Sequence, residues 1–256
     1  MKGGILIIGS LLWDTTVNNR ENWRERLDIS NKRKIALPIR YGRCSSENRN
    51  YTYTMVISKN FEMLNSMGQG YFVPFKKSID TEDRFIEEVI QFAKAEGFKG
   101  NRIAASWGSS CLKINPEASN EKNEFLTSIW GKLVLKIKTE RKSNQTIPEL
   151  RQFGIEGEEK SITENWFSNI SNNVFKEIND VDFLLITSTA IRHRKTTEMK
   201  YPKVSEIAKA IYEGEYYEYF VRNRIEGIYT SEDKLIARIL KRKYKVSLKK
   251  IRKKWA

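Results

Sequence analysis

Apolar and polar residues alternate along the chain with two different periods, which predict strands in some segments and helices in others. The clearest strand is 51–58, where Tyr51, Tyr53, Met55 and Ile57 share one face and mostly polar residues share the other. Short apolar runs predict further strands at 4–8, 33–41, 70–75, 130–138 and 182–187. Pro38 places the second of these at a sheet edge or at a bulge.

Capping residues and helical spacing predict four helices between and after these strands. The first begins at Asp80 or Thr81, continues to Ala95 and stops at Gly97. The capping-box sequence SITE at 161–164 predicts a second helix to about residue 178, and two more are expected near 203–222 and 231–243. Strands interleaved with helices predict an α+β or α/β protein with one main domain.

Glu96 is the most informative single residue of the chain. In a helix that advances about 100° per residue, Phe85, Val89, Phe92 and Ala93 form one apolar arc, and Glu96 falls near its middle. A carboxyl group there faces the core, and the negative end of the helix dipole further disfavours its ionisation. Both effects raise its pKa towards the range that suits proton transfer at neutral pH. If the helix instead frays one residue earlier, this side chain turns into water and has no such role.

The first predicted strand ends in a turn, Ile8-Gly9-Ser10-Leu11, that can bind an anion. Glycine lets backbone N–H groups approach a ligand closely, and consecutive donors can hold a carboxylate or an oxyanion. Because any strand can end in Gly-Ser, the turn indicates a binding site only in combination with Glu96.

The composition narrows the function classes. Of the 256 residues, 39% are apolar and 30% are charged, which excludes a disordered chain and a membrane protein. The single histidine, His193, excludes a multi-histidine metal site, and the two cysteines, Cys44 and Cys111, are too few for a disulfide framework. No segment approaches the roughly 20 apolar residues of a membrane span, and Gly9-Ser10 interrupts the apolar start where a signal peptide would continue. We therefore expect a cytoplasmic protein.

Positive charge is concentrated at the C-terminus. The formal net charge is +14, and residues 241–256 hold nine Lys or Arg and no acid, which leaves about +5 for the first 240 residues. We therefore divide the chain into a main domain, 1–230, and a basic C-terminal helix or tail, 231–256. The tail can act as an amphipathic helix on nucleic acid or on an anionic membrane, or remain a solvated arm. If Tyr244, Leu248, Ile251 and Trp255 dock on the domain, the segment is a structural helix rather than a free arm.

Several of these segments together resemble the gamma-glutamyl cyclotransferase-like superfamily. Gly9-Ser10-Leu11 is similar to the family's loop after its first strand, and Glu96-Gly97 is similar to the Glu-Gly pair that carries its catalytic glutamate. The segments GSLLWD (9–14), LPIRYGRCS (37–45) and YTYTMVIS (51–58) look like the bacterial branch with a Gly-Ser-Leu-x-Trp-Asp opening. The resemblance covers roughly residues 4–100 and, more weakly, 160–225. Ile8 departs from the family, which often has a tyrosine at this position.

The resemblance implies a small mixed β-barrel or sheet with helices packed outside and a cavity at the strand ends. It implies a lyase reaction, an intramolecular aminolysis, in which the α-amine of a gamma-glutamyl group attacks its own γ-carbonyl. The products are 5-oxoproline and a free amine or amino acid. Glu96 matches the general acid/base, and the turn of Gly9, Ser10 and Leu11 matches the part that binds substrate, with the last two N–H groups as an anion cradle. No metal or cofactor is implied.

Arg43 lies in the Arg-x-Ser match of the resemblance and is a candidate partner for a substrate carboxylate. A solvated arginine after a strand accounts for it equally well. Two other functions stay open beside the enzyme. One is a ligand-binding relative of the same fold without turnover, and the other is a protein that binds nucleic acid or another anionic partner through residues 241–256.

Overall fold

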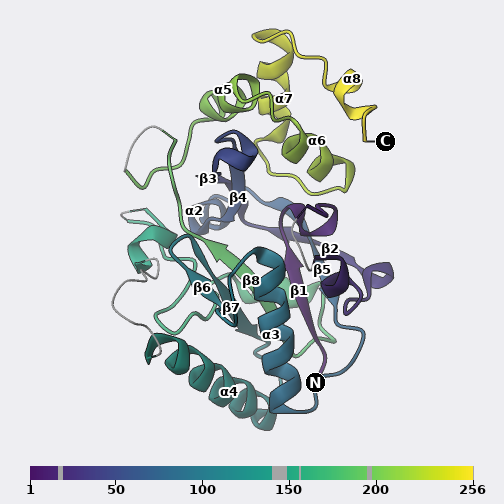
Figure 1. The fold of residues 1–256 in the computed structure, drawn as a ribbon. Helices are drawn as coiled ribbons and strands as arrows, with labels where there is room; N and C mark the ends of the chain where they lie inside the picture. The colour runs from purple at the N-terminus through teal and green to yellow at the C-terminus, as the bar shows by residue number, and fades with distance from the viewer. Residues whose placement is uncertain (17–19, 140–148, 156, 195–197, 256) are drawn as a thin grey trace.

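The strands of the computed structural model form one mixed sheet and a separate hairpin (Figure 1). The structure describes residues 1–16, 20–139, 149–155, 157–194 and 198–255. The sheet has the order β2-β5-β1-β8-β7-β6, with β1 parallel to β8 and antiparallel pairs elsewhere. Its strands are β1 (Gly3–Ile7), β2 (Arg33–Leu37), β5 (Gly68–Pro74), β6 (Ala104–Ala105), β7 (Gly108–Ile114) and β8 (Phe183–Thr189). The hairpin consists of β3 (Ile39–Cys44) and β4 (Tyr53–Ile57).

The expectation of a mixed α+β protein is confirmed, but its barrel alternative is wrong. The described strands leave the sheet open, with β2 and β6 at its edges and the β3–β4 hairpin separate. The predicted strand 33–41 is two strands, which meet at Pro38. Proline has no N–H to continue a ladder, so β2 ends there and β3 begins a new pairing with β4. Among the described strands, β2 therefore does not continue into the β3–β4 hairpin, which stays separate from the sheet.

Helices occupy both ends of the molecule (Figure 1). The helices α3 and α4 lie beside the sheet, whereas α5 to α8 gather at the end far from the N-terminus. The described helices are α1 (Arg20–Arg24), α2 (Lys59–Met63), α3 (Glu82–Glu96), α4 (Asn120–Thr139), α5 (Val204–Glu213), α6 (Glu218–Ile225), α7 (Asp233–Arg242) and α8 (Leu248–Arg252). The predicted helix 203–222 is thus α5 and α6, separated at Glu215, whose φ of 49° breaks the helical path.

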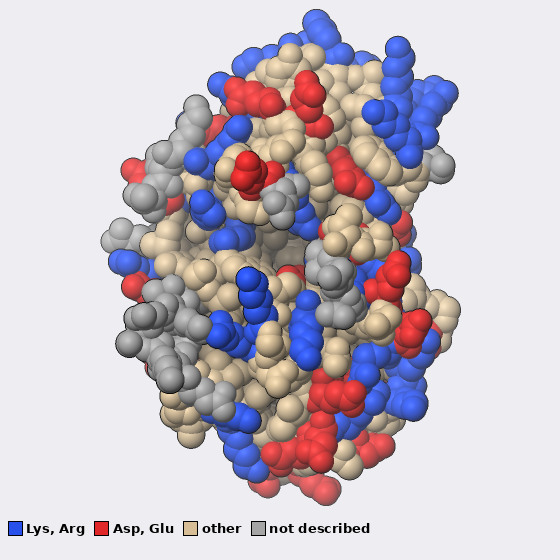
Figure 2. Space-filling model, in the orientation of Figure 1, with Lys and Arg blue, Asp and Glu red and all other residues tan. Residues whose placement is uncertain are grey.

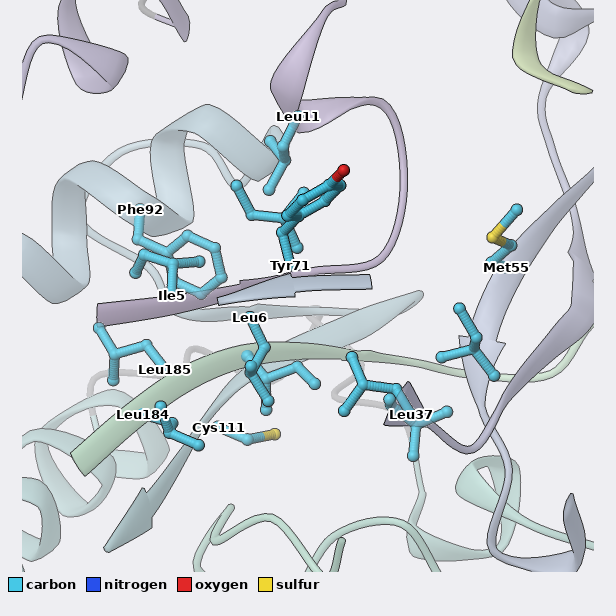
Figure 3. Packing of buried hydrophobic residues seen from close by; sticks show 14 of the residues in the cluster. Ile5, Leu6, Leu11, Leu37, Met55, Tyr71, Phe92, Cys111, Leu184 and Leu185 are labelled. Atoms are coloured by element: carbon cyan, nitrogen blue, oxygen red, sulfur yellow. The ribbon is translucent and has the colours of Figure 1, made fainter. Parts of the chain in front are cut away.

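The central strand β1 is buried on both faces. Ile5 points towards α3 and Phe92, whereas Leu6 and Cys111 lie on the opposite side of the sheet (Figure 3). Because side chains of a strand alternate between faces, one run of apolar residues supplies two layers of core. The strand GGILI is fully buried along its length, as its apolar run predicts.

The prediction of a strand at 130–138 is wrong, because this segment is the second half of the helix α4. Taken alone, its short apolar run is typical of a strand. Together with the preceding turn of the chain, its apolar residues recur at helical spacing and form one buried stripe, which consists of Leu126, Ile129, Trp130, Leu133, Val134 and Ile137. The helical spacing over the whole of α4 therefore outweighs the short apolar run within it.

The prediction of a helix at 161–178 is also wrong. The Thr163 hydroxyl accepts a hydrogen bond from the Phe167 N–H (3.1 Å), and Trp166 has φ 58°, so the backbone turns instead of coiling. The segment then runs beside β7, where Leu112 donates to Trp166 O and accepts from Ser168 N. A capping-box sequence therefore serves a turn here, and only Asn172–Lys176 forms a short 3₁₀ helix.

The basic C-terminal segment docks on the rest of the chain. Ile236 and Leu240 of α7 are fully buried, and Tyr244, Leu248, Ile251 and Trp255 are partly buried against the core. The segment is therefore a docked structural helix rather than a free arm; Ala256 lies outside the described residues. In the part of the chain that is described, no helix has the length and apolar character to cross a membrane.

Candidate functional site

Glu96 is the last residue of α3, where the sequence places it. Thr81 caps the start of the helix through its side chain, and Gly97 ends it in the left-handed conformation with φ 102°. Phe85, Val89 and Phe92 are fully buried on the face that Glu96 extends. The helix does not fray before Glu96, so its carboxyl group is held on the apolar side.

Opposing influences act on the Glu96 carboxyl group. Burial raises its pKa above the ordinary value of 4.5, and this effect prevails. The charges of Arg20 and Arg49 and the hydroxyl of Thr187 act in the other direction, because they favour the ionised form. The Glu96 carboxyl group therefore combines a raised pKa with neighbouring groups that favour its ionised form, as suits a group that takes up and returns a proton.

Asp14 joins the two arginines into one cluster. Its Oδ2 lies 2.6 Å from Arg20 Nη1 and 3.0 Å from Arg49 Nη2, and all but Arg49 are buried. Burial alone would raise the pKa of Asp14, but hydrogen bonds from Thr16 and the charges of both arginines hold it below its ordinary value. Arg20 also donates to the carbonyl of Ala95 (2.8 Å), so the cluster is fastened to the end of α3.

The turn after β1 is tied to the same cluster. The Ser10 hydroxyl accepts a hydrogen bond from Arg49 Nη2 (3.1 Å), and Ser10 and Leu11 are buried. Ser10–Leu12 is a single 3₁₀ turn, so the N–H groups of Ser10 and Leu11 have no acceptor within it. Arg49 therefore links this turn to Glu96.

Tyr219 of α6 is a site residue that the sequence reasoning missed. A Cβ atom on Gly9 would lie only 2.7 Å from the Tyr219 hydroxyl oxygen, so this close approach requires glycine. The hydroxyl accepts a hydrogen bond from the Met55 N–H (3.2 Å). Burial, with a smaller contribution from Glu96, raises the pKa of Tyr219. Its helical spacing with other aromatic residues indicates only packing, so no local pattern marks it.

Two facing strands direct buried hydroxyl groups to the same side of the sheet. Thr187 of β8 pairs in register with Ser110 of β7. Neither hydroxyl makes a hydrogen bond of regular geometry within the described part of the chain, yet the Thr187 hydroxyl is near enough to Glu96 to lower its pKa. Buried hydroxyl groups without a protein partner are suited to bind a ligand or a water molecule. The sequence predicts β8 but not β7, because GSSCLKI begins with polar residues.

Arg43 lies in β3, apart from the Asp14 cluster. Burial, reinforced by Arg192, lowers its pKa to about 10. Its Nη1 donates to Ala190 O (3.1 Å), and its guanidinium lies 6.0 Å from the centroid of the Trp107 ring. Among the described residues no acidic side chain forms an ion pair with it, which is unusual for a cation in this position.

Trp107 connects Arg43 to the end of α3. Its ring stacks on Phe98, two residues after Glu96, with centroids 4.4 Å apart and an interplanar angle of 5°. The structure therefore brings Gly9, Ser10 and Glu96 into one cluster and joins Arg43 to it only through an aromatic pair.

The surface is hollowed near this cluster. Figure 2 shows a depression in the face where, in the same view of Figure 1, α3, β1 and β8 end. Lys and Arg side chains border much of it. Within the described residues, no group of three or more His, Cys, Asp or Glu is arranged to hold a metal ion. The free Cys44 and Cys111 are both buried, and burial raises the pKa of the Cys111 thiol to about 12.

Comparison with known proteins gives no relative: no family model, curated protein or solved structure matches the chain. The candidate site is therefore interpreted from its own residues.

Proposed function

We propose that the protein is a gamma-glutamyl cyclotransferase-like enzyme with Glu96 as its general acid/base. The observation that carries the proposal is the position of Glu96, a carboxyl group with a raised pKa at the end of α3, next to Arg20 and Arg49. Arg49 also binds the Ser10 hydroxyl of the turn that the family resemblance assigns to substrate binding. The proposed fold type rests on that resemblance, with an open sheet in place of a barrel.

The proposed reaction needs one proton carrier. Glu96 takes a proton from the α-ammonium group of a gamma-glutamyl substrate, and the freed amine attacks the γ-carbonyl carbon. The bond between that carbon and the leaving nitrogen breaks as Glu96 returns the proton to this nitrogen. The second proton that the attacking nitrogen loses on becoming a lactam N–H passes to the released amine, which leaves as an ammonium ion. The products are 5-oxoproline and an amine. The N–H groups of Ser10 and Leu11 are the proposed donors to the developing oxyanion.

Arg43, which lies next to Trp107 of the Phe98–Trp107 pair, also supports the proposal. A largely buried guanidinium without an acidic partner is stabilised when an anion binds, and a substrate carboxylate has the matching charge and shape. We assign this role to Arg43. The enzyme so proposed requires neither a metal nor a cofactor for proton transfer, and we place it in the cytoplasm.

The test of the proposed function is the Glu96→Gln variant. Purified protein is incubated with a panel of gamma-glutamyl amines and amino acids, and release of 5-oxoproline is measured. The amide cannot relay a proton, so we expect kcat to fall by about 100-fold or more while 5-oxoproline still binds. Glu82→Gln, in the first turn of the same helix, is the matched control and should retain the parent rate.

Two outcomes contradict this function. If the Gln variant turns over a substrate at the parent rate, Glu96 is not the acid/base. If the parent protein binds 5-oxoproline but turns over no member of the panel, the protein is the ligand-binding relative without catalysis.

A further inference from the structure

The C-terminal helices carry an unusually uniform positive surface. Between Lys234 and Lys254 the chain has eleven Lys and Arg and no acid, and all eleven side chains are exposed. The nearby ion pairs are made by Arg222 and Arg224 of α6; none of the eleven forms one within the described part of the chain. Figure 2 shows Lys and Arg side chains projecting from the end of the molecule where α7 and α8 lie. We call these eleven side chains the basic surface.

The apolar residues of the same segment face the other way. Leu240 is fully buried, and Leu248, Ile251 and Trp255 are partly buried against the core. Tyr244 stacks on Tyr212 of α5, with ring centroids 4.4 Å apart. A membrane-bound amphipathic helix inserts such residues between lipids, and here they are already packed on the protein. The segment therefore offers a partner mainly its charge.

A groove between α6 and α8 gives the basic surface a defined binding place. It has a volume of about 260 Å³, with Arg224 on one wall and Lys249 and Arg252 on the other. Val221, Ile225 and Leu248 supply apolar lining. Cations on both walls above an apolar lining match a chain of phosphates joined by sugars, in which charge and apolar atoms alternate.

We propose that the basic surface binds nucleic acid through its phosphate backbone, with the groove between α6 and α8 as the centre of the contact. Exposed cations that are not paired with protein acids release the counterions of the nucleic acid when they bind phosphates. The binding so proposed is insensitive to sequence and strongly dependent on salt. It is independent of the candidate site at Glu96.

The test uses the full chain and two labelled probes, a single-stranded RNA of about 20 nucleotides and a DNA duplex of the same length. Binding is measured by fluorescence anisotropy at several salt concentrations. For Lys249→Glu/Arg252→Glu we expect affinity for the better probe to fall by about tenfold or more in low salt. The slope of log K against log salt should decrease by between about 1.4 and 1.8. Lys76→Glu/Lys77→Glu changes the net charge equally from an exposed loop before α3, and should weaken binding by less than about threefold.

Thermal unfolding of each variant shows whether it is folded. Should Lys249→Glu/Arg252→Glu unfold, the exposed pair Lys250→Glu/Lys253→Glu replaces it with the same expectation. Absence of binding by the parent protein to both probes in low salt overturns the proposal. Equal losses in the groove variant and the loop control also overturn it, because binding then follows net charge alone. Binding to phosphatidylserine vesicles but to neither probe assigns the surface to an anionic membrane instead.

Discussion

Glu96 shows how the surroundings of a single side chain shift its pKa. The helix presents it on the buried face, which disfavours the charged form. Arg20, Thr187 and Arg49 come from three other parts of the chain and favour the charged form. The effect of burial prevails, so the pKa of Glu96 is raised although these three groups act to lower it. Each of these groups can be changed separately.

Thr187→Val tests this balance without requiring catalysis. The substitution keeps the shape of the side chain and removes the hydroxyl that lowers the pKa of Glu96, so we expect the pKa to rise further above 4.5. The measurement is a ¹³C NMR titration of the side-chain carboxyl, assigned by its disappearance in Glu96→Gln. Thr189→Val, two residues along β8, is the control and should leave the titration unchanged. Identical titrations in the parent protein and Thr187→Val would show that the hydroxyl does not act on Glu96.

At the scale of elements, local signals locate one half of the candidate site and not the other. The cap at Thr81, the stop at Gly97 and the apolar arc are enough to place Glu96 on the correct face of its helix. The turn after β1 is found in the same way. Local signals do not identify Arg49 and Tyr219, because each reaches the site through a contact between segments far apart in the chain. Their own neighbours in the sequence carry no pattern that indicates such a contact.

Local patterns also mislead where two periods overlap. Residues 130–138 contain a short apolar run that is typical of a strand, but α4 continues from Asn120 and its whole length determines the outcome. The SITE sequence at 161–164 has the composition of a helix start, yet β7 offers backbone partners that a helix could not use. In both segments tertiary pairing or a longer stripe outweighs the short signal.

Substitution by alanine should change the stability of the protein in opposite directions at Gly97, which ends α3, and at Gly131, which lies inside α4. Gly97→Ala places a side chain at φ 102° and should destabilise the protein by about 1 kcal/mol. Gly131→Ala lies inside α4 with open space around its Cβ position and should stabilise by between about 0.5 and 1 kcal/mol. Urea unfolding of the two variants measures both. A gain in stability for Gly97→Ala would mean that α3 does not end in the left-handed conformation that positions Glu96.

At the scale of the whole molecule, the C-terminal helices are joined to the rest by buried polar groups as well as apolar ones. Tyr219 of α6 contacts the turn after β1, and Glu232, just before α7, pairs with Arg40 of β3 at 3.2 Å. Burial raises the pKa of Tyr41, also in β3, and the buried Asp233 of α7 raises it further. The division of the chain into 1–230 and 231–256 stays a prediction. Because α7 is packed through these buried groups, the charge state of Asp233 affects the stability of the chain.

Asp233 should make the whole protein less stable as the pH rises from about 4 to about 6. Burial raises its pKa to about 6, against hydrogen bonds from Thr230 and the charge of Arg224. Over that interval the folded state therefore holds a proton that the unfolded state has released. Asp233→Asn stays neutral and can still accept the Thr230 hydrogen bonds, which both reach Oδ1. Relative to the parent protein we expect it to gain stability with rising pH, by up to about 3 kcal/mol above pH 7.

Urea unfolding at pH 4.5, 6.0 and 7.5 measures this difference. Asp180→Asn supplies a control of opposite sign, because the hydrogen bond from Arg33 to Asp180 lowers the pKa of that exposed carboxyl. Its contribution to stability is fully present above its unfolded pKa of 3.8 and is lost only as the pH falls below that value, so its removal should destabilise the protein by nearly the same amount at all three pH values. Parallel stability curves for Asp233→Asn and the parent protein would show that Asp233 titrates in the folded state as it does in the unfolded chain. The polar junction between α7 and β3 would then be open to water and not part of the buried core.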